Sequence, residues 1–169
     1  MIKLETERLI FRDHELRDLE PYCAIESDPV YRSPQRVHPR AELERAFRET
    51  AMRPKEIGLH AMEFKPDGRY IGRAGLYPFR NQRGETQPGE AFIAFYIARP
   101  YWGRGIATEA GRAWITHGFE HLGITRIEAG INAANAASLR VIEKLGFTHL
   151  RSGGDEHTKW HDFELRRAW

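Results

Sequence analysis

The sequence is poor in cysteine and in long hydrophobic runs. Its one cysteine, Cys23, cannot form an internal disulfide, so the fold needs no oxidising compartment. No segment approaches the roughly 20 consecutive apolar residues of a membrane-spanning helix. Charged side chains at Lys3, Glu5, Glu7 and Arg8 interrupt the amino-terminal segment, which therefore lacks the apolar core of a signal peptide. These absences predict a cytoplasmic protein without a membrane partner.

The chain also has no strong excess of charge of either sign. Its 26 lysines and arginines nearly balance 24 aspartates and glutamates, which gives a formal net charge of +2. A surplus this small and this evenly spread does not favour a nucleic-acid partner. A length of 169 residues is ordinary for one compact domain with a buried core, so we expect residues 1–169 to form a single domain.

Hydrophobic periodicity predicts a mixed architecture. The pattern favours strands at 7–13, 57–64, 69–77, 91–97, 125–131, 148–151 and 159–166, and helices at 15–27, 40–53, 107–122 and 135–145. The polar stretch Asn81 to Gly89 and the proline-containing segment 30–40 are expected to be loops. The resulting order, β-α-α-β-β-β-α-β-α-β-β, is that of a layered α/β domain.

A glycine-rich turn follows the predicted buried strand Ala91–Ile97 and opens the next helix. Gly103 and Gly105 flank Arg104, and glycines allow backbone N–H groups to converge on one point. The unpaired N–H groups of the helix start and the helix dipole favour a phosphate or diphosphate there. The alternative is that these glycines serve turn geometry alone. The turn is neither a P-loop nor a dinucleotide fingerprint, because the required Lys-Ser/Thr and third glycine are absent.

Three segments together resemble the GNAT family of acetyl-CoA-dependent N-acetyltransferases, in particular its RimJ/RimL-type branch of ribosomal-protein N-terminal acetyltransferases. They are Leu4-Glu5-Thr6-Glu7-Arg8-Leu9, the run from Tyr101 to Ala110, and Asn132, Asn135 and Ser138 with Lys144-Leu145-Gly146-Phe147. The resemblance covers nearly the whole chain. It implies an α/β (α+β) GNAT fold with a mixed, mostly antiparallel sheet of about six to seven strands, splayed between the fourth and fifth strands and flanked by about four helices.

The resemblance implies acetyl-CoA as co-substrate, with no metal. The pantetheine is expected along Phe95, Tyr96 and Ile97, and the pyrophosphate on the glycine-rich loop. The implied cofactor-binding residues beyond the strand are Trp102, Gly103, Arg104, Gly105, Ile106, Ala107, Thr108, Asn132 and Asn135. Two assignments stay open: Arg104 either adds charge or is a solvated surface residue, and Asn135 contacts pantetheine, caps its helix, or does both.

The implied reaction is direct transfer of the acetyl group to a neutral primary amine. An α-amine has a pKa of about 7.7–8.0, against about 10.4 for lysine, which favours a protein or peptide N-terminus as acceptor. Glu90 is the candidate general base, acting through water, although it is equally interpretable as an exposed carboxylate. Many members of the branch carry a glutamate where this chain has Phe92, which leaves the base uncertain.

The leaving thiolate needs only modest help, because its pKa lies near about 8.5. The position at which many GNAT enzymes carry a tyrosine acid holds Ile142. In the RimL-like branch a serine one turn earlier has this task, and Ser138 matches it. The alternative is a helix hydroxyl bonded back to its own turn.

Two other functions remain open at this point. One is a non-catalytic module that binds acyl-CoA. The other is an acetyltransferase for a small polyamine or antibiotic amine, whose cationic acceptor would need carboxylates such as Glu85, Glu90, Asp155 and Glu156 near the site. We expect a monomer or a homodimer.

Histidines and the first long loop complete the candidate residues. His149, His157 and His161 lack the further ligands of a zinc site, so no structural metal is predicted. Tyr31, Arg36 and His38 fall in the loop that borders the acceptor slot in this family.

Overall fold

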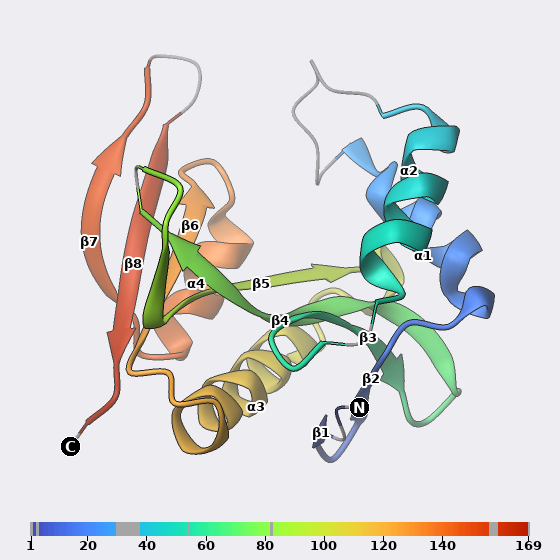
Figure 1. Cartoon of the computed structure of the whole chain (residues 1–169), viewed down its shortest axis with the longest axis horizontal. Coiled ribbons are helices and arrows are strands. Elements are labelled where there is room, and N and C mark those ends of the chain that lie inside the picture. Colours follow the sequence, from blue (N-terminus) through green and yellow to red (C-terminus); the bar gives the residue numbers. More distant parts are fainter. Residues whose placement is uncertain are drawn as a thin grey trace.

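The computed structural model describes residues 2, 4–29, 38–53, 55–81, 83–155 and 159–168. Within these residues the strands form one eight-stranded sheet in the order β1-β2-β3-β4-β5-β6-β8-β7 (Figure 1). The strands are β1 (Leu4–Glu5), β2 (Leu9–Arg12), β3 (Gly58–Phe64), β4 (Arg69–Arg80), β5 (Thr86–Ile97), β6 (Arg126–Asn132), β7 (Thr148–Gly153) and β8 (Trp160–Arg166). The main helices are α1 (Leu19–Glu26), α2 (Arg40–Ala46), α3 (Ile106–His121) and α4 (Ala136–Lys144).

The sheet is antiparallel except at one place. β5 and β6 are parallel neighbours, and every other adjacent pair runs antiparallel. This topology confirms the predicted fold class, and the splay expected between the fourth and fifth predicted strands falls at the parallel pair. The additional strand is β1, a two-residue segment that pairs with β2 through Leu4 and Phe11.

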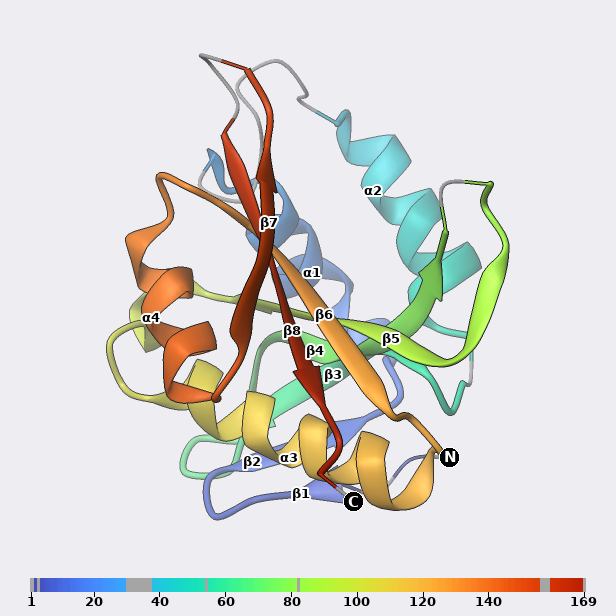
Figure 2. The same cartoon turned by 90° about the vertical axis from the view of Figure 1, so that its left-hand side faces the viewer.

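Helices cover both faces of the sheet (Figures 1 and 2). On one face, α3 buries Trp114 completely, with its ring 5.5 Å from that of Phe11 in an edge-to-face arrangement. On the other face, α1 and α2 form a smaller apolar cluster that includes Cys23 and Phe47. Cys23 is 1% exposed, as expected of a small buried apolar residue. No helix of the described residues is long and apolar enough to cross a membrane.

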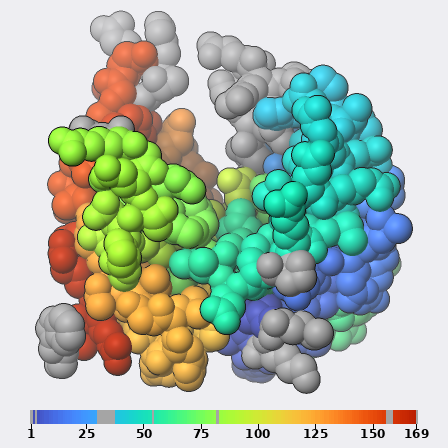
Figure 3. Space-filling view, viewed as in Figure 1, coloured from blue at the N-terminus to red at the C-terminus, as the bar shows by residue number. Residues whose placement is uncertain are grey.

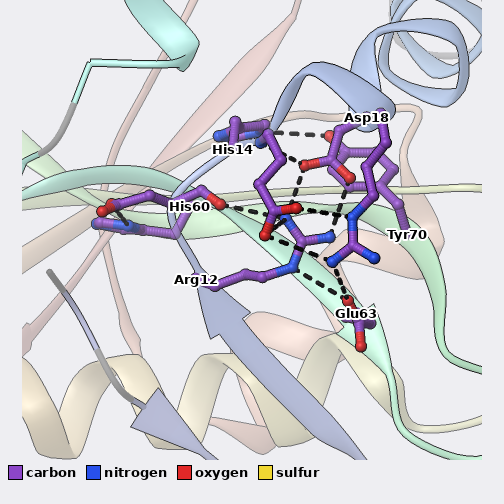
Figure 4. Close-up of polar contacts among 9 residues, drawn as sticks. Arg12, His14, Asp18, His60, Glu63 and Tyr70 are labelled. Carbon is purple, nitrogen blue, oxygen red and sulfur yellow. Dashed lines mark hydrogen bonds and ion pairs between the residues drawn. The ribbon is translucent and has the colours of Figure 1, made fainter.

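A buried ion pair begins the first helix (Figure 4). The guanidinium of Arg12 donates to both carboxylate oxygens of Asp18, at 2.7 and 2.9 Å, and to Glu63 at 3.0 Å. Asp18 also accepts the backbone N–H of Glu15 at 2.8 Å, closing a capping box. The predicted helix 15–27 therefore begins with a 3₁₀ turn, η1 (Leu16–Asp18), and continues as α1.

Two predicted boundaries were wrong. Asn81 to Gly89 is not all loop, because β5 already begins at Thr86, which pairs with Arg80. The side chain of Asn81 accepts hydrogen bonds from the backbone N–H groups of Arg83 and Glu85. This closes a tight turn, so the polar residues after it pair with β4 as part of β5.

The second predicted helix, 40–53, also departs from the prediction. Regular α2 ends at Ala46, and a five-residue π-helical turn, η3 (Phe47–Ala51), follows. Phe47 is fully buried between α1 and α2, so packing of this large ring accompanies the change of helical period.

Candidate active site

The parallel strands β5 and β6 separate after a short paired region. Their register joins Glu90 to Arg126, Ala91 to Ile127 and Phe92 to Glu128. β5 then continues through Ile93–Ile97 without β6 as a neighbour, whereas β6 stays paired with β8 along its length. The two strands thus form a fork whose closed end is the Phe92–Glu128 pair (Figure 2).

The glycine-rich turn lies at the open end of this fork. Gly103 and Gly105 have φ values of +70° and +77°, in the left-handed region that favours glycine. Gly105 is the N-cap of α3, and the N–H of Glu109 donates to its carbonyl at 3.0 Å. The preceding N–H groups at Ile106–Thr108 have no partner within the helix and form a positive end that suits an anion.

Contacts from distant segments brace the turn. The indole N–H of Trp102 donates to the carbonyl of Ile97 at 2.5 Å. Arg8 donates to the carbonyl of Arg104 at 2.9 Å and to the carboxylate of Glu109 at 2.7 Å. The Arg104 guanidinium lies over the ring of Phe64, 4.8 Å from its centroid, and so is held against the core rather than over the turn.

A pocket of about 300 Å³ joins the turn, the fork and α4. Its lining includes most of the predicted cofactor residues, namely Phe95, Ile97, Trp102, Gly103, Gly105, Ile106, Ala107, Thr108 and Asn135, together with Ser138. Asn135 also caps α4, because its side chain accepts the N–H of Ser138 at 3.0 Å. One position of Asn135 therefore allows both interpretations, the helix cap and the contact with pantetheine.

Other predicted site residues lie outside this lining. Tyr96 faces the opposite side of β5, where Arg73 stacks 4.5 Å from its ring centroid. Asn132 accepts the N–H of Ala134 at 2.9 Å and so shapes the turn before α4. Glu90 lies in the paired part of the fork, where its carboxylate accepts a hydrogen bond from Arg126 at 2.7 Å.

The sequence analysis missed two cations of the pocket. Arg140 and Lys144 lie one turn apart on α4 and both line it. Both therefore share one pocket with the glycine-rich turn and add positive charge to it. Their spacing of four residues on a helix was a readable signal, since side chains at i and i+4 share a face.

A third residue without a predicted role is Glu128 on β6. It is 1% exposed, and it shares Arg126 with Glu90 and Glu164. An acidic residue between the apolar residues Ile127 and Ala129 of a predicted strand was the available signal.

A larger groove of about 950 Å³ follows the outer side of α3. Its lining includes Arg8, Arg112, His117 and His121. The edge strand β1 lines this groove through Leu4 and Glu5, but neither the fork nor the first turn of α4 does, so the groove does not connect the glycine-rich turn with the separated strands. The smaller pocket is therefore the candidate active site.

The histidines form a different arrangement from a metal centre. The hydroxyl of Ser152 lies 2.8 Å from His149 Nε2 and 2.7 Å from His161 Nδ1. Among the described residues, no three His, Cys, Asp or Glu side chains are grouped to hold a metal ion. His38 pairs with Glu42 at 3.0 Å. Tyr31, Arg36, Glu156 and His157 lie outside the described residues.

Comparison with known proteins agrees with this geometry. A family model for the acetyltransferase (GNAT) domain matches residues 8–148. The chain is 28% identical to the uncharacterized N-acetyltransferase p20 of Bacillus licheniformis over 87% of this chain and 83% of that one. It is 42% identical to the probable N-acetyltransferase YjcK of Bacillus subtilis over 59% of this chain and 54% of that one, about half its length.

Two further matches bear on fold and branch. The crystal structure of a GNAT-family acetyltransferase from Bacillus anthracis superposes with a TM-score of 0.83 over 98% of each chain, at 18% identity. The putative ribosomal N-acetyltransferase YdaF of Bacillus subtilis is 32% identical over 47% of this chain and 48% of that one. The structural match shows the fold, and the matched family model spans most of the chain.

Proposed function

The chain belongs to the acetyltransferase (GNAT) domain family, and on this premise we propose that its acceptor is the α-amine of a protein or peptide N-terminus. Membership makes the chain an N-acetyltransferase and implies acetyl-CoA as co-substrate. The single observation that carries transfer from acetyl-CoA is the fork that opens beyond Phe92 and Glu128, with the candidate pocket along it. The choice of an α-amine depends on its lower pKa and on the likeness to YdaF.

The pocket has the features that acetyl-CoA requires. An extended pantetheine fits along the unpaired edge of Ile93–Ile97, where backbone groups are available for hydrogen bonds. A diphosphate fits the N–H groups at the start of α3, and Arg140 and Lys144 add positive charge beside it. Asn135, the cap residue of α4, and Ser138, on its first turn, line the same pocket.

The acceptor is proposed to reach the fork from the face of the sheet opposite the acetyl-CoA pocket. Figure 3 shows a hollow between α2 and the segment around the β4–β5 turn, with β5 at its floor. A hollow open to solvent suits the flexible end of a peptide. Because an α-amine is substantially neutral near pH 7.5, it can attack without a strong base, whereas a lysine cannot. The likeness to YdaF, a putative ribosomal N-acetyltransferase, supports the same acceptor class.

Ser138 is proposed to stabilise the departing sulfur. It lines the pocket one turn before Ile142, which is fully buried and offers no acid. A hydroxyl at this position can donate a hydrogen bond to a developing thiolate. Replacing Ser138 with alanine should lower kcat about tenfold to a hundredfold with little change in the affinity for acetyl-CoA.

The test is release of coenzyme A thiol with a matched acceptor panel. The panel contains a peptide with a free N-terminus, the same peptide N-terminally blocked but carrying lysine, and spermidine. We expect turnover with the first and little with the others. Turnover only with spermidine would assign a polyamine acceptor, and tight acetyl-CoA binding without any turnover would assign a binding module.

A further inference from the structure

One carboxylate oxygen at the closed end of the fork is buried without a hydrogen bond. Glu128 is 1% exposed, and its Oε1 is held by Arg126. Among the described residues, its Oε2 has no hydrogen-bond donor; the nearest cation is Arg151, whose Nη2 lies 3.6 Å away. Leaving a buried acceptor unsatisfied is costly, more so when it is charged, and a donor from outside the chain would relieve that cost.

Glu128 lies on the face of the sheet from which the acceptor approaches. Phe92 and Tyr96 share one face of β5, because side chains four residues apart on a strand point the same way. Tyr96 stacks on Arg73, which forms a 2.6 Å ion pair with Glu26 of α1. Glu128 is the register partner of Phe92 and so shares this face, opposite the pocket side of the fork.

We propose that Glu128 Oε2 accepts a hydrogen bond from the acceptor amine and takes its proton during acetyl transfer. This inference rests on the proposed function. The amine nitrogen bonds to the acetyl carbon while the carbon–sulfur bond breaks and its electron pair leaves on the sulfur. The nitrogen passes one proton to Glu128 Oε2. The thiolate then takes up a proton, and Glu128 returns its own to solvent, so the sum is amide plus thiol.

The position of Glu128 suits the proton acceptor better than that of Glu90. Glu90 lies two residues before the fork opens, its carboxylate is 31% exposed, and its Oε2 already accepts from Arg126. Glu128 belongs to the last paired position, next to the gap itself. Its strand partner is Phe92, so the two strands together present one carboxylate and one ring at the fork.

The charge around Glu128 suits an amine. Arg126 is shared by three carboxylates, those of Glu90, Glu128 and Glu164. Arg151 is bound mainly by Asp162, at 2.8 Å. Arg166 also binds Glu164, at 3.1 Å. The four carboxylates thus outnumber the three arginines by one, and the remaining negative charge favours an amine over an anion.

The experiment compares Glu128→Gln with Glu164→Gln as matched control. Glu164 is the register partner of Glu128 on β8 and binds the same arginine, at 2.8 Å, but lies on the side away from the fork. With a free-N-terminus peptide, Glu128→Gln should lower kcat at least about 100-fold and remove the acid-side fall of kcat with pH. Glu164→Gln should change kcat by no more than about threefold and should keep the acid-side fall of kcat with pH. Acetyl-CoA affinity by calorimetry should be unchanged in both.

A kcat near wild type in Glu128→Gln, or an equal loss in Glu164→Gln, would overturn the inference. Should Glu128→Gln fail to fold, Arg151→Gln serves instead, because this side chain is 55% exposed. Removing the cation nearest to Oε2 should move the acid-side fall of kcat to higher pH, and an unmoved profile would overturn the inference. Absence of turnover in the wild type with every acceptor would instead overturn the proposed function.

Discussion

Arg8 and Glu109, which are 101 positions apart in sequence, form an ion pair that joins the amino-terminal segment to the first turn of α3. The Arg8 Nη2 lies 2.6 Å from Glu109 Oε2, and Arg8 Nη1 donates to the carbonyl of Arg104. Thr6 donates its hydroxyl to the same carboxylate at 2.5 Å. The opening Leu4–Leu9 motif therefore supports the glycine-rich turn, although it lies outside the candidate pocket.

Replacing Arg8 with methionine should weaken acetyl-CoA binding severalfold, because the Arg104 carbonyl loses its donor and the turn loosens. Hydrogen bonds to charged groups contribute about 1.5–3 kcal/mol each, so thermal stability should also fall measurably. The control is Lys65→Ala, which removes a 2.7 Å hydrogen bond to Thr6 in the same segment without touching the turn. Calorimetry that shows equal losses of affinity in both variants would contradict this role.

Replacing Gly105 with valine should abolish acetyl-CoA binding while the chain still folds. A side chain at φ +77° is strained by about 1–2 kcal/mol, and its Cβ would lie 3.6 Å from Nη2 of Arg8, which binds the Arg104 carbonyl of the same turn. Gly84 has the same φ and open space around it, so Gly84→Val imposes the same strain far from the pocket. Calorimetry should show normal affinity in the Gly84 variant alone. Unchanged affinity in the Gly105 variant would refute the assignment of the turn.

Two substitutions at Asn135 separate its roles. Asn135→Ala removes the cap on the Ser138 N–H and should lower the free energy of unfolding by about 1 kcal/mol. Asn135→Asp keeps an acceptor for the cap but loses the amide donor. If Asn135 contacts pantetheine, both variants lose acetyl-CoA affinity, whereas only the alanine variant loses cap stability. Normal affinity in Asn135→Asp would leave the cap as its only role.

Buried histidines should make the fold sensitive to acid. Burial lowers the pKa of His60 to about 4 and that of His14 to about 3, from 6.5 in an unfolded chain. Between pH 6.5 and about 4 the unfolded state then binds more protons, so the free energy of unfolding decreases as the pH falls. The slope approaches about 1.4 kcal/mol per pH unit for each histidine.

The variant His60→Phe tests this pH dependence. A phenylalanine keeps a flat ring against Trp114, on which His60 stacks at a centroid distance of 5.0 Å. Denaturant unfolding at pH 7 and pH 5 should show a smaller loss of stability in the variant than in the wild type. His121→Gln, an exposed replacement on α3, is the control. An unchanged pH dependence in His60→Phe would show that His60 contributes nothing to it.

What the sequence predicted well depends on local chemistry. The glycine-rich turn at 103–105, the cap at Asn135 and the cores of the alternating strands are properties of a few neighbouring residues, and the structure has them where they were predicted. The fork followed from the family resemblance, and the pairing of β5 with β6 agrees with it.

The features that sequence did not predict depend on pairing between distant segments. Glu128 faces Phe92 only because β5 and β6 have one particular parallel register. Arg104 lies on Phe64 because the turn packs against β3, which no local pattern reveals. The early start of β5 at Thr86 depends on the turn at Asn81, whose side chain accepts a hydrogen bond from the N–H of Glu85.

The most direct test of the whole account is a crystal structure of the chain with coenzyme A. We predict pantetheine along Ile93–Ile97 in the fork, and diphosphate oxygens within about 3 Å of backbone N–H groups of the turn at 103–108. Coenzyme A bound instead in the groove along α3, beside Arg112 and His117, with the fork empty, would contradict the account.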